Sequence, residues 1–264
     1  MKIDTSSYYP ETGGKEGFSL NRRETTLFGE VKKEEDSAVP TAEERKADTN
    51  PRPEPEVPPK EWERVVSGAS HFLSWVLVPL LMPVYGLLLA FSLSILDLAP
   101  MSTRVGFTLI VAGINVLVPM MLVLLLKKMG IVDDLGLNGR KERLIPYIIS
   151  IVALAGTAVF MYYKGAPHWL VWFFGGGAIG GCVNLIVNFW WKISAHAAGI
   201  AGVVALLVRI ARDGNPHPAV FGWLIAAIII AGLLGSSRVW LGRHTVWQVL
   251  AGLLVGFTSV ILFT

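Results

Sequence analysis

The chain has 264 residues, of which 53% are hydrophobic, and its formal net charge of +3 comes from 23 Lys and Arg against 20 Asp and Glu. The charge is unevenly divided, because residues 1–68 hold 11 basic and 15 acidic residues, which leaves residues 69–264 net basic by 7. This pattern is typical of a membrane domain with a polar tail and gives no indication of nucleic-acid binding. A single cysteine, Cys182, excludes a disulfide framework and a thiolate metal site.

The first segment, residues 1–68, is acidic and rich in proline. It has too few apolar residues to offset the entropy lost on ordering, so we expect a disordered tail. Its beginning lacks the apolar core of a signal peptide, which predicts that the tail stays in the cytoplasm. A proline-rich stretch over residues 51–59 is a candidate docking segment for a protein partner of the tail.

The second segment, residues 69–264, is a series of apolar runs separated by short polar loops, as expected for helices that cross a bilayer. It predicts an all-α integral membrane fold of about seven transmembrane helices, at residues 70–96, 103–127, 145–164, 168–190, 194–211, 218–236 and 243–263. Small residues in "GGGAIGGCVN", "AHAAGIAG" and "VLAGLLVG" favour close contacts between helices, and hence a compact bundle.

Polar residues gather on one side of this expected bundle. Alternating crossings place the loops at 128–144, 191–194 and 237–243 on the same side. With the adjoining helix starts they carry a basic and histidine-containing set, Arg140, Lys141, Arg143, Lys192, His196, Arg238, Arg243 and His244. The other side holds His168 and His217, which we interpret, like His71, as interfacial histidines.

A basic cluster with two histidines is suited to phosphate chemistry. Arginine holds phosphate oxygens in a bidentate manner, and a dry site strengthens each contact. Ser194 is a favourable N-cap, so the free N–H groups at the start of the next helix add to an anion site beside His196. One histidine can then attack phosphorus while a second protonates the leaving oxygen.

The stretch "SRVWLGRHTVWQ" resembles the third signature of the type 2 phosphatidic acid phosphatase family of membrane enzymes. That signature reads Ser-Arg, five residues, His, three residues, Asp. Ser237, Arg238 and His244 stand at the corresponding positions, and Gln248 occupies the place of the Asp.

The other two family signatures are less complete. The second reads Pro-Ser-Gly-His, and "KISAH" keeps its serine and histidine as Ser194 and His196. The first reads Lys, six residues, Arg-Pro, and only a loose version, "RKERLIP", is present, in which Arg143 or Lys141 would substitute from shifted places.

The resemblance implies a six-helix phosphatase-like core with one extra N-terminal helix, and a phosphorylated lipid as substrate. It implies that His244 attacks phosphorus to form a phosphohistidine and that His196 is the general acid. The phosphate would be bound by Arg238, Arg143 and Lys141, with Ser194 and Arg243 beside them. No metal or cofactor is implied.

Gln248 is the main departure from the family. A carboxylate at this position orients the nucleophilic imidazole and stabilises its cation, whereas an amide oxygen can only accept the ring N–H. The sequence therefore leaves open a lipid phosphatase, a lipid phosphotransferase, and a catalytically weakened member that binds anionic lipid or a partner protein.

The predicted side of the site follows from loop charge. The site side holds eight Lys and Arg and the opposite side four, which favours a cytoplasmic site in a bacterial-type inner membrane. The acidic pair Asp133 and Asp134 lacks further metal ligands at a suitable spacing, so we expect no metal site there.

Overall fold

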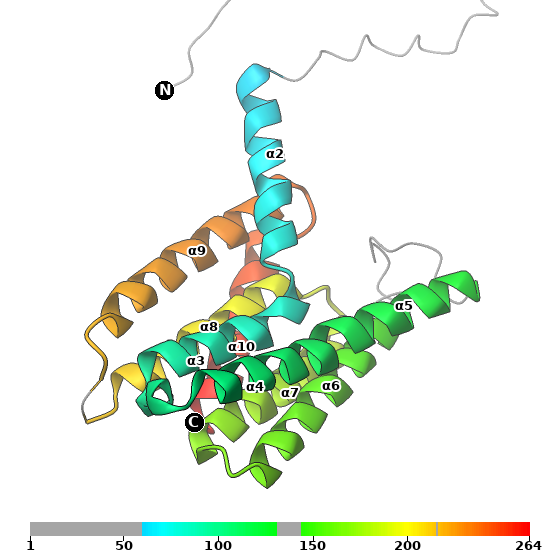
Figure 1. The fold of residues 1–264 in the computed structure, drawn as a ribbon. Helices are drawn as coiled ribbons and strands as arrows, with labels where there is room; N and C mark the ends of the chain where they lie inside the picture. Colours follow the sequence, from blue (N-terminus) through cyan, green and yellow to red (C-terminus); the bar gives the residue numbers. More distant parts are fainter. Residues whose placement is uncertain (1–59, 131–143, 215) are drawn as a thin grey trace, which may run out of the picture. The chain divides into compact units, whose positions relative to one another are not determined.

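The computed structural model describes residues 60–130, 144–214 and 216–264, all within one unit of the chain, Pro58–Thr264. Its regular elements are all helical (Figure 1). They are α2 (Glu61–Val76), η1 (Pro79–Leu81), α3 (Met82–Leu93), η2 (Ile95–Leu98), α4 (Met101–Ala112), η3 (Gly113–Leu117), α5 (Val118–Lys128), α6 (Leu144–Tyr163), α7 (His168–Asn188), α8 (Ala195–Ala211), α9 (Val220–Trp240) and α10 (Val246–Ile261). The all-α prediction is confirmed.

Apolar helices account for the predicted crossings. Five segments are long and apolar enough to span a membrane: Glu61–Leu93, Met101–Lys128, Leu144–Tyr163, His168–Asn188 and Val220–Trp240. Two shorter apolar helices are α8 and α10. Large apolar side chains such as Leu109, Met121 and Ile229 are exposed, which is costly in water and favourable against lipid. The fold is thus that of an integral membrane protein.

The helix expected over residues 70–96 is instead two helices that meet at a break. α2 begins at Glu61, before the predicted start and within the segment assigned to the tail, and it ends at Val76. Pro79 then starts a short 3-10 turn, and Pro83 lies in the first turn of α3. A proline lacks the N–H of a helical hydrogen bond and disfavours helical geometry in the residue before it, which explains the break.

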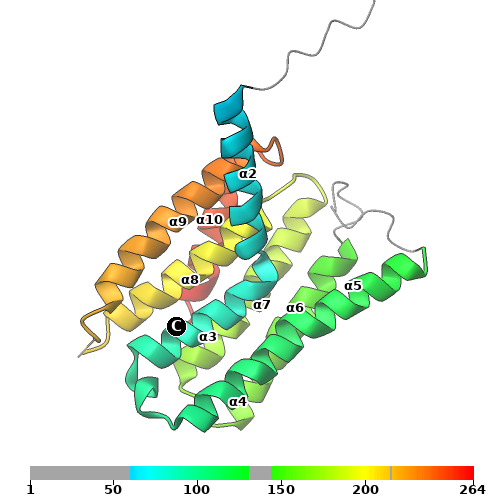
Figure 2. The same cartoon turned by 45° about the horizontal axis from the view of Figure 1, so that its top comes forward.

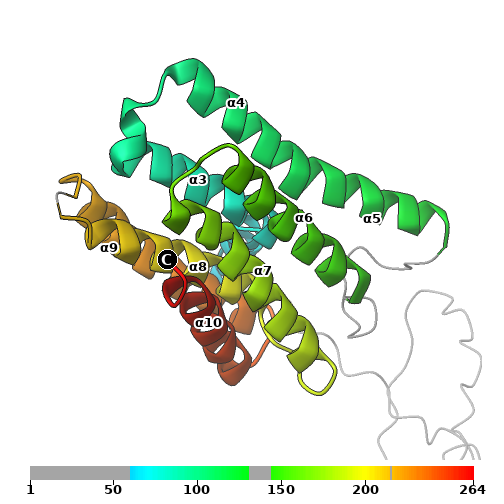
Figure 3. The same ribbon diagram turned by 90° about the horizontal axis from the view of Figure 1, so that it is seen from below.

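A second irregularity interrupts the helical rod formed by α4 and α5, which runs beside α6 (Figure 3). The joint is a π-helical turn, η3, and its Asn115 side chain is buried. Both Nδ2 hydrogens are used, since Nδ2 donates to the Val111 carbonyl at 3.1 Å and to the Thr157 hydroxyl of α6 at 2.7 Å. The Asn115 side chain therefore connects the π-helical turn to α6 by a hydrogen bond.

α8 is largely buried and lies beside α10 (Figure 2). Glycines on α10 allow the two backbones to approach, because a Cβ at Gly252 would lie 2.5 Å from the Ser194 carbonyl oxygen and one at Gly256 would lie 2.0 Å from that of Ala198. On the other side of α10, a Cβ at Gly176 of α7 would lie 2.3 Å from the Ser259 carbonyl oxygen. The predicted close packing of the small-residue stretches is confirmed.

This packing makes a stability prediction for Gly256→Ala. The added methyl group would meet the α8 backbone, which cannot move aside. We therefore expect the free energy of unfolding to fall by about 1–3 kcal/mol. Thermal unfolding of the detergent-purified protein measures it. The matched control is Gly222→Ala on α9, where a Cβ meets nothing within 4 Å. Equal unfolding temperatures for the two variants would contradict the proposed tight α8–α10 contact.

Candidate functional site

Several predicted site residues meet at one end of the helices. The α7–α8 and α9–α10 connections lie at this end (Figure 2). Arg238, in the last turn of α9, His244, just before α10, and His196, in the first turn of α8, line the same cavity. Lys141 and Arg143 lie outside the described residues.

The turn between α9 and α10 fixes Arg238 and His244 relative to each other. Gly242 has a φ of +63°, a left-handed conformation that glycine adopts without strain. The backbone carbonyl of Arg238 accepts hydrogen bonds from the N–H groups of Arg243, at 3.1 Å, and His244, at 3.2 Å. The arginine and the histidine are therefore held by one closed turn, while Arg243 is absent from the cavity lining.

Gln248 determines which nitrogen of His244 carries a proton. Its Oε1 accepts a hydrogen bond from the Thr245 backbone N–H at 3.2 Å, and it lies 3.1 Å from Nδ1 of His244. Because a backbone N–H can only donate, the atom that faces it is the amide oxygen, and the ring nitrogen that meets the same oxygen must donate. In the neutral imidazole Nε2 then holds the lone pair, as a nucleophile requires.

The same glutamine caps α10. The Thr245 hydroxyl accepts from the Gln248 N–H at 3.4 Å, which together with the bond to Oε1 forms a capping box. Gln248 is thus both a helix-capping residue and the partner of His244.

Ser194 connects the two histidine-bearing helices. Its hydroxyl caps α8 by accepting from the Ala197 N–H at 3.3 Å, as the sequence predicted. Its own N–H donates to the Gln248 carbonyl at 3.2 Å. The starts of α8 and α10 are therefore fixed to each other, although the Ser194 side chain is buried and does not line the cavity.

His196 is held by the broken first helix. Its Nε2 lies 3.2 Å from the backbone carbonyl oxygen of Ser74. Because α2 ends at Val76, this carbonyl is among the last four of the helix, which have no intrahelical partner. A carbonyl only accepts, so Nε2 of His196 carries a proton.

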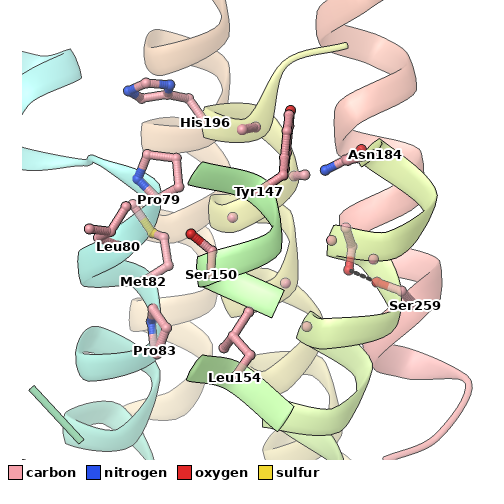
Figure 4. A pocket seen from close by; sticks show the side chains of 18 of the residues that line it. Pro79, Leu80, Met82, Pro83, Tyr147, Ser150, Leu154, Asn184, His196 and Ser259 are labelled. Carbon is pink, nitrogen blue, oxygen red and sulfur yellow. Dashed lines mark hydrogen bonds between the residues drawn. The ribbon is translucent and has the colours of Figure 1, made fainter. Parts of the chain in front are cut away.

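The cavity measures about 370 Å³ and extends from the two histidines into the helices. Pro79, Met82, Tyr147, Leu154 and Asn184 are among the residues around it (Figure 4). This size lies within the usual range of small-molecule sites. Arg238, His196 and His244 are polar lining residues at helix ends, whereas most of the remaining wall, which includes Leu154, Phe173 and Val260, is apolar.

Some cavity residues were not anticipated from the sequence. Tyr147 and Ser150 of α6, Asn184 of α7 and Asn115 of η3 all line the cavity. Their only sequence signal is a polar group within an apolar helix, which marks functional positions in membrane proteins.

Comparison with family models, curated proteins and solved structures finds no match for this chain. Within the described residues there is also no group of three His, Cys, Asp or Glu side chains placed to hold a metal ion.

The Gln248 contact makes a prediction for Gln248→Leu. Without the amide oxygen, neutral His244 loses its preference for a proton on Nδ1, and the ¹⁵N chemical shifts of labelled histidine measure this change. His168 is an internal control, since its Nε2 accepts from the Trp172 indole at 3.0 Å and Gln248 is not involved. An unchanged His244 signal would show that Gln248 does not set the tautomer.

Proposed function

We propose that this protein is an integral membrane phosphatase that hydrolyses a phosphomonoester or diphosphate of a lipid through a phosphohistidine intermediate. The observation that carries the proposal is the cavity that joins Arg238, His196 and His244 to an apolar chamber among the helices. A phosphate at the polar end and a lipid chain in the apolar part match the two halves of such a substrate.

In the first step, the Nε2 lone pair of His244 attacks phosphorus, and a bond forms between this nitrogen and phosphorus as the bond to the lipid oxygen breaks. His196, in its imidazolium form, transfers its Nδ1 proton to the leaving oxygen, because its Nε2 proton is held by the Ser74 carbonyl. A phosphomonoester then releases the lipid as an alcohol, and a diphosphate releases the lipid monophosphate.

In the second step, water attacks the phosphohistidine and His196 accepts its proton. The nitrogen–phosphorus bond breaks, inorganic phosphate leaves, and both histidines return to their starting forms. If an alcohol takes the place of water, the same intermediate gives a phosphotransferase.

Arg238 is proposed to bind the phosphate oxygens, because its guanidinium can form two parallel hydrogen bonds to them. The start of α8 adds N–H groups that favour an anion. Lys141, Arg143 and Arg243 are proposed to contribute further positive charge.

The test is phosphate release from a panel of lipid phosphates by protein purified in detergent. We expect His244→Ala and His196→Ala each to lower the rate by about 10²-fold or more, because each removes a group that acts in the chemical step. The matched control is His168→Ala, which should retain the wild-type rate. His168 is the first residue of α7, at the end of this helix away from the α7–α8 connection. Equal rates in all four proteins would refute the proposal.

A second candidate function rests on Gln248, which is neutral where the resemblance places a carboxylate. An amide oxygen orients the imidazole but adds no negative charge to stabilise the cation that develops during attack. The site would then turn over slowly or serve to bind anionic lipid, or a partner protein through the tail.

The variant Gln248→Glu separates slow turnover from pure binding. Glutamate has the length of glutamine, so it can keep both hydrogen bonds of the capping box while adding the missing charge. For a weakened phosphatase we expect kcat to rise by about tenfold or more. No gain, together with no measurable wild-type activity, would favour the binding function.

We also propose that the protein lies in a bacterial-type inner membrane, with the site and the N-terminal tail on the cytoplasmic side. The support is the excess of Lys and Arg in the loops of the site side.

A further inference from the structure

Asn184 is a buried polar side chain in the wall of the cavity. It lies on α7, near the end that leads to the loop before His196, and only 4% of its surface is exposed. Its Oδ1 has no hydrogen-bond partner among the described residues. Figure 4 shows its side chain directed into the cavity, toward Tyr147.

Two hydroxyls of the cavity wall are occupied within the protein. The Ser150 hydroxyl donates to the Pro146 carbonyl at 2.9 Å, and that of Ser259 donates to the Gly256 carbonyl at 3.2 Å. Asn115 uses both of its amide hydrogens, which leaves its Oδ1 as an acceptor without a donor in the described part of the chain. The Asn184 oxygen has no such bond within the described residues, so its amide can turn about Cβ–Cγ and present either end to a ligand.

A bound lipid determines whether this amide is satisfied. The large majority of buried side-chain polar groups in proteins have a hydrogen-bond partner, so an exception in a cavity wall indicates a partner that arrives with the ligand. A chain of pure hydrocarbon beside Asn184 provides none. A hydroxyl or an amide N–H at that depth donates to the Asn184 oxygen.

We propose that Asn184 selects lipid phosphates that carry a hydroxyl or an amide N–H a few bonds from the phosphate, in preference to lipids whose chain begins directly as hydrocarbon. This inference rests on the proposed function in one respect, that the cavity takes a lipid phosphate. Asn184 is then a specificity-determining residue in the wall of the cavity that holds the phosphate-binding residues.

The test uses two lipids that differ in one group. They are 1-oleoyl-glycerol-3-phosphate, with a free hydroxyl on its second carbon, and its 2-deoxy analogue. Binding to His244→Ala protein in detergent is measured by isothermal titration calorimetry, so the result does not depend on turnover. We expect the hydroxylated lipid to bind about tenfold more tightly, and we expect Asn184→Leu to remove this preference while the deoxy lipid binds as before.

The matched control variant is Ser150→Ala, which alters the same cavity at a hydroxyl that is already bonded to its own helix. It should keep the preference. If Asn184→Leu does not yield folded protein, Asn184→Ala and the wild-type side chain still provide the comparison.

The two proposals fail in different ways. Equal binding of the two lipids, a preference that survives Asn184→Leu, or no binding of either lipid would overturn the role of Asn184. Selective binding without any phosphate release by the wild-type protein would support Asn184 and remove the phosphatase. Phosphate release at equal rates from both lipids, with equal binding, would leave the phosphatase and overturn the role of Asn184.

Discussion

The hydrogen bond from the Ser194 N–H to the Gln248 carbonyl, 3.2 Å long, joins the first turns of α8 and α10. It depends on the glycines that let these helices touch, because a Cβ at Gly252 would lie 2.5 Å from the Ser194 carbonyl oxygen. His196 follows one partner of this bond and His244 precedes the other by a few residues. The spacing of the two histidines is thus set by backbone contact, which varies far less than contact between long side chains.

The helices could be predicted from the sequence because apolar runs of the right length are a sufficient signal for crossings. The break after Val76 was missed, since the residues on both sides of it are apolar, although Pro79 and Pro83 were visible signs of it. Residue types and the count of crossings predicted that Arg238, His196 and His244 lie together, and they line one cavity. Asn184 was not, because a helix that is apolar all round does not reveal which of its faces borders a cavity.

Gln248 has two structural roles, and each role allows a different set of side chains at this position. As the third residue of α10 it completes a capping box, for which glutamine and glutamate are both suited. As the partner of His244 it selects a tautomer, for which any acceptor oxygen is sufficient. Neither duty requires a negative charge. Only the stabilisation of a histidine cation requires a negative charge. The neutral side chain of Gln248 therefore affects the proposed chemical step and leaves the fold unchanged.

The cavity has its origin in the same irregularities that interrupt the helices. Close packing around α8 and α10 would normally leave no space, because helices with small residues approach until their backbones meet. The proline break between α2 and α3 and the π turn that carries Asn115 both border the cavity, and so do the glycines Gly177 and Gly181 of α7. A glycine removes a side chain from the wall, while a break changes the direction of a helix that would otherwise fill the space. The Ser74 carbonyl left without a helical partner by the same break holds His196. The interruption of the first helix therefore both opens the chamber and orients a histidine at its entrance.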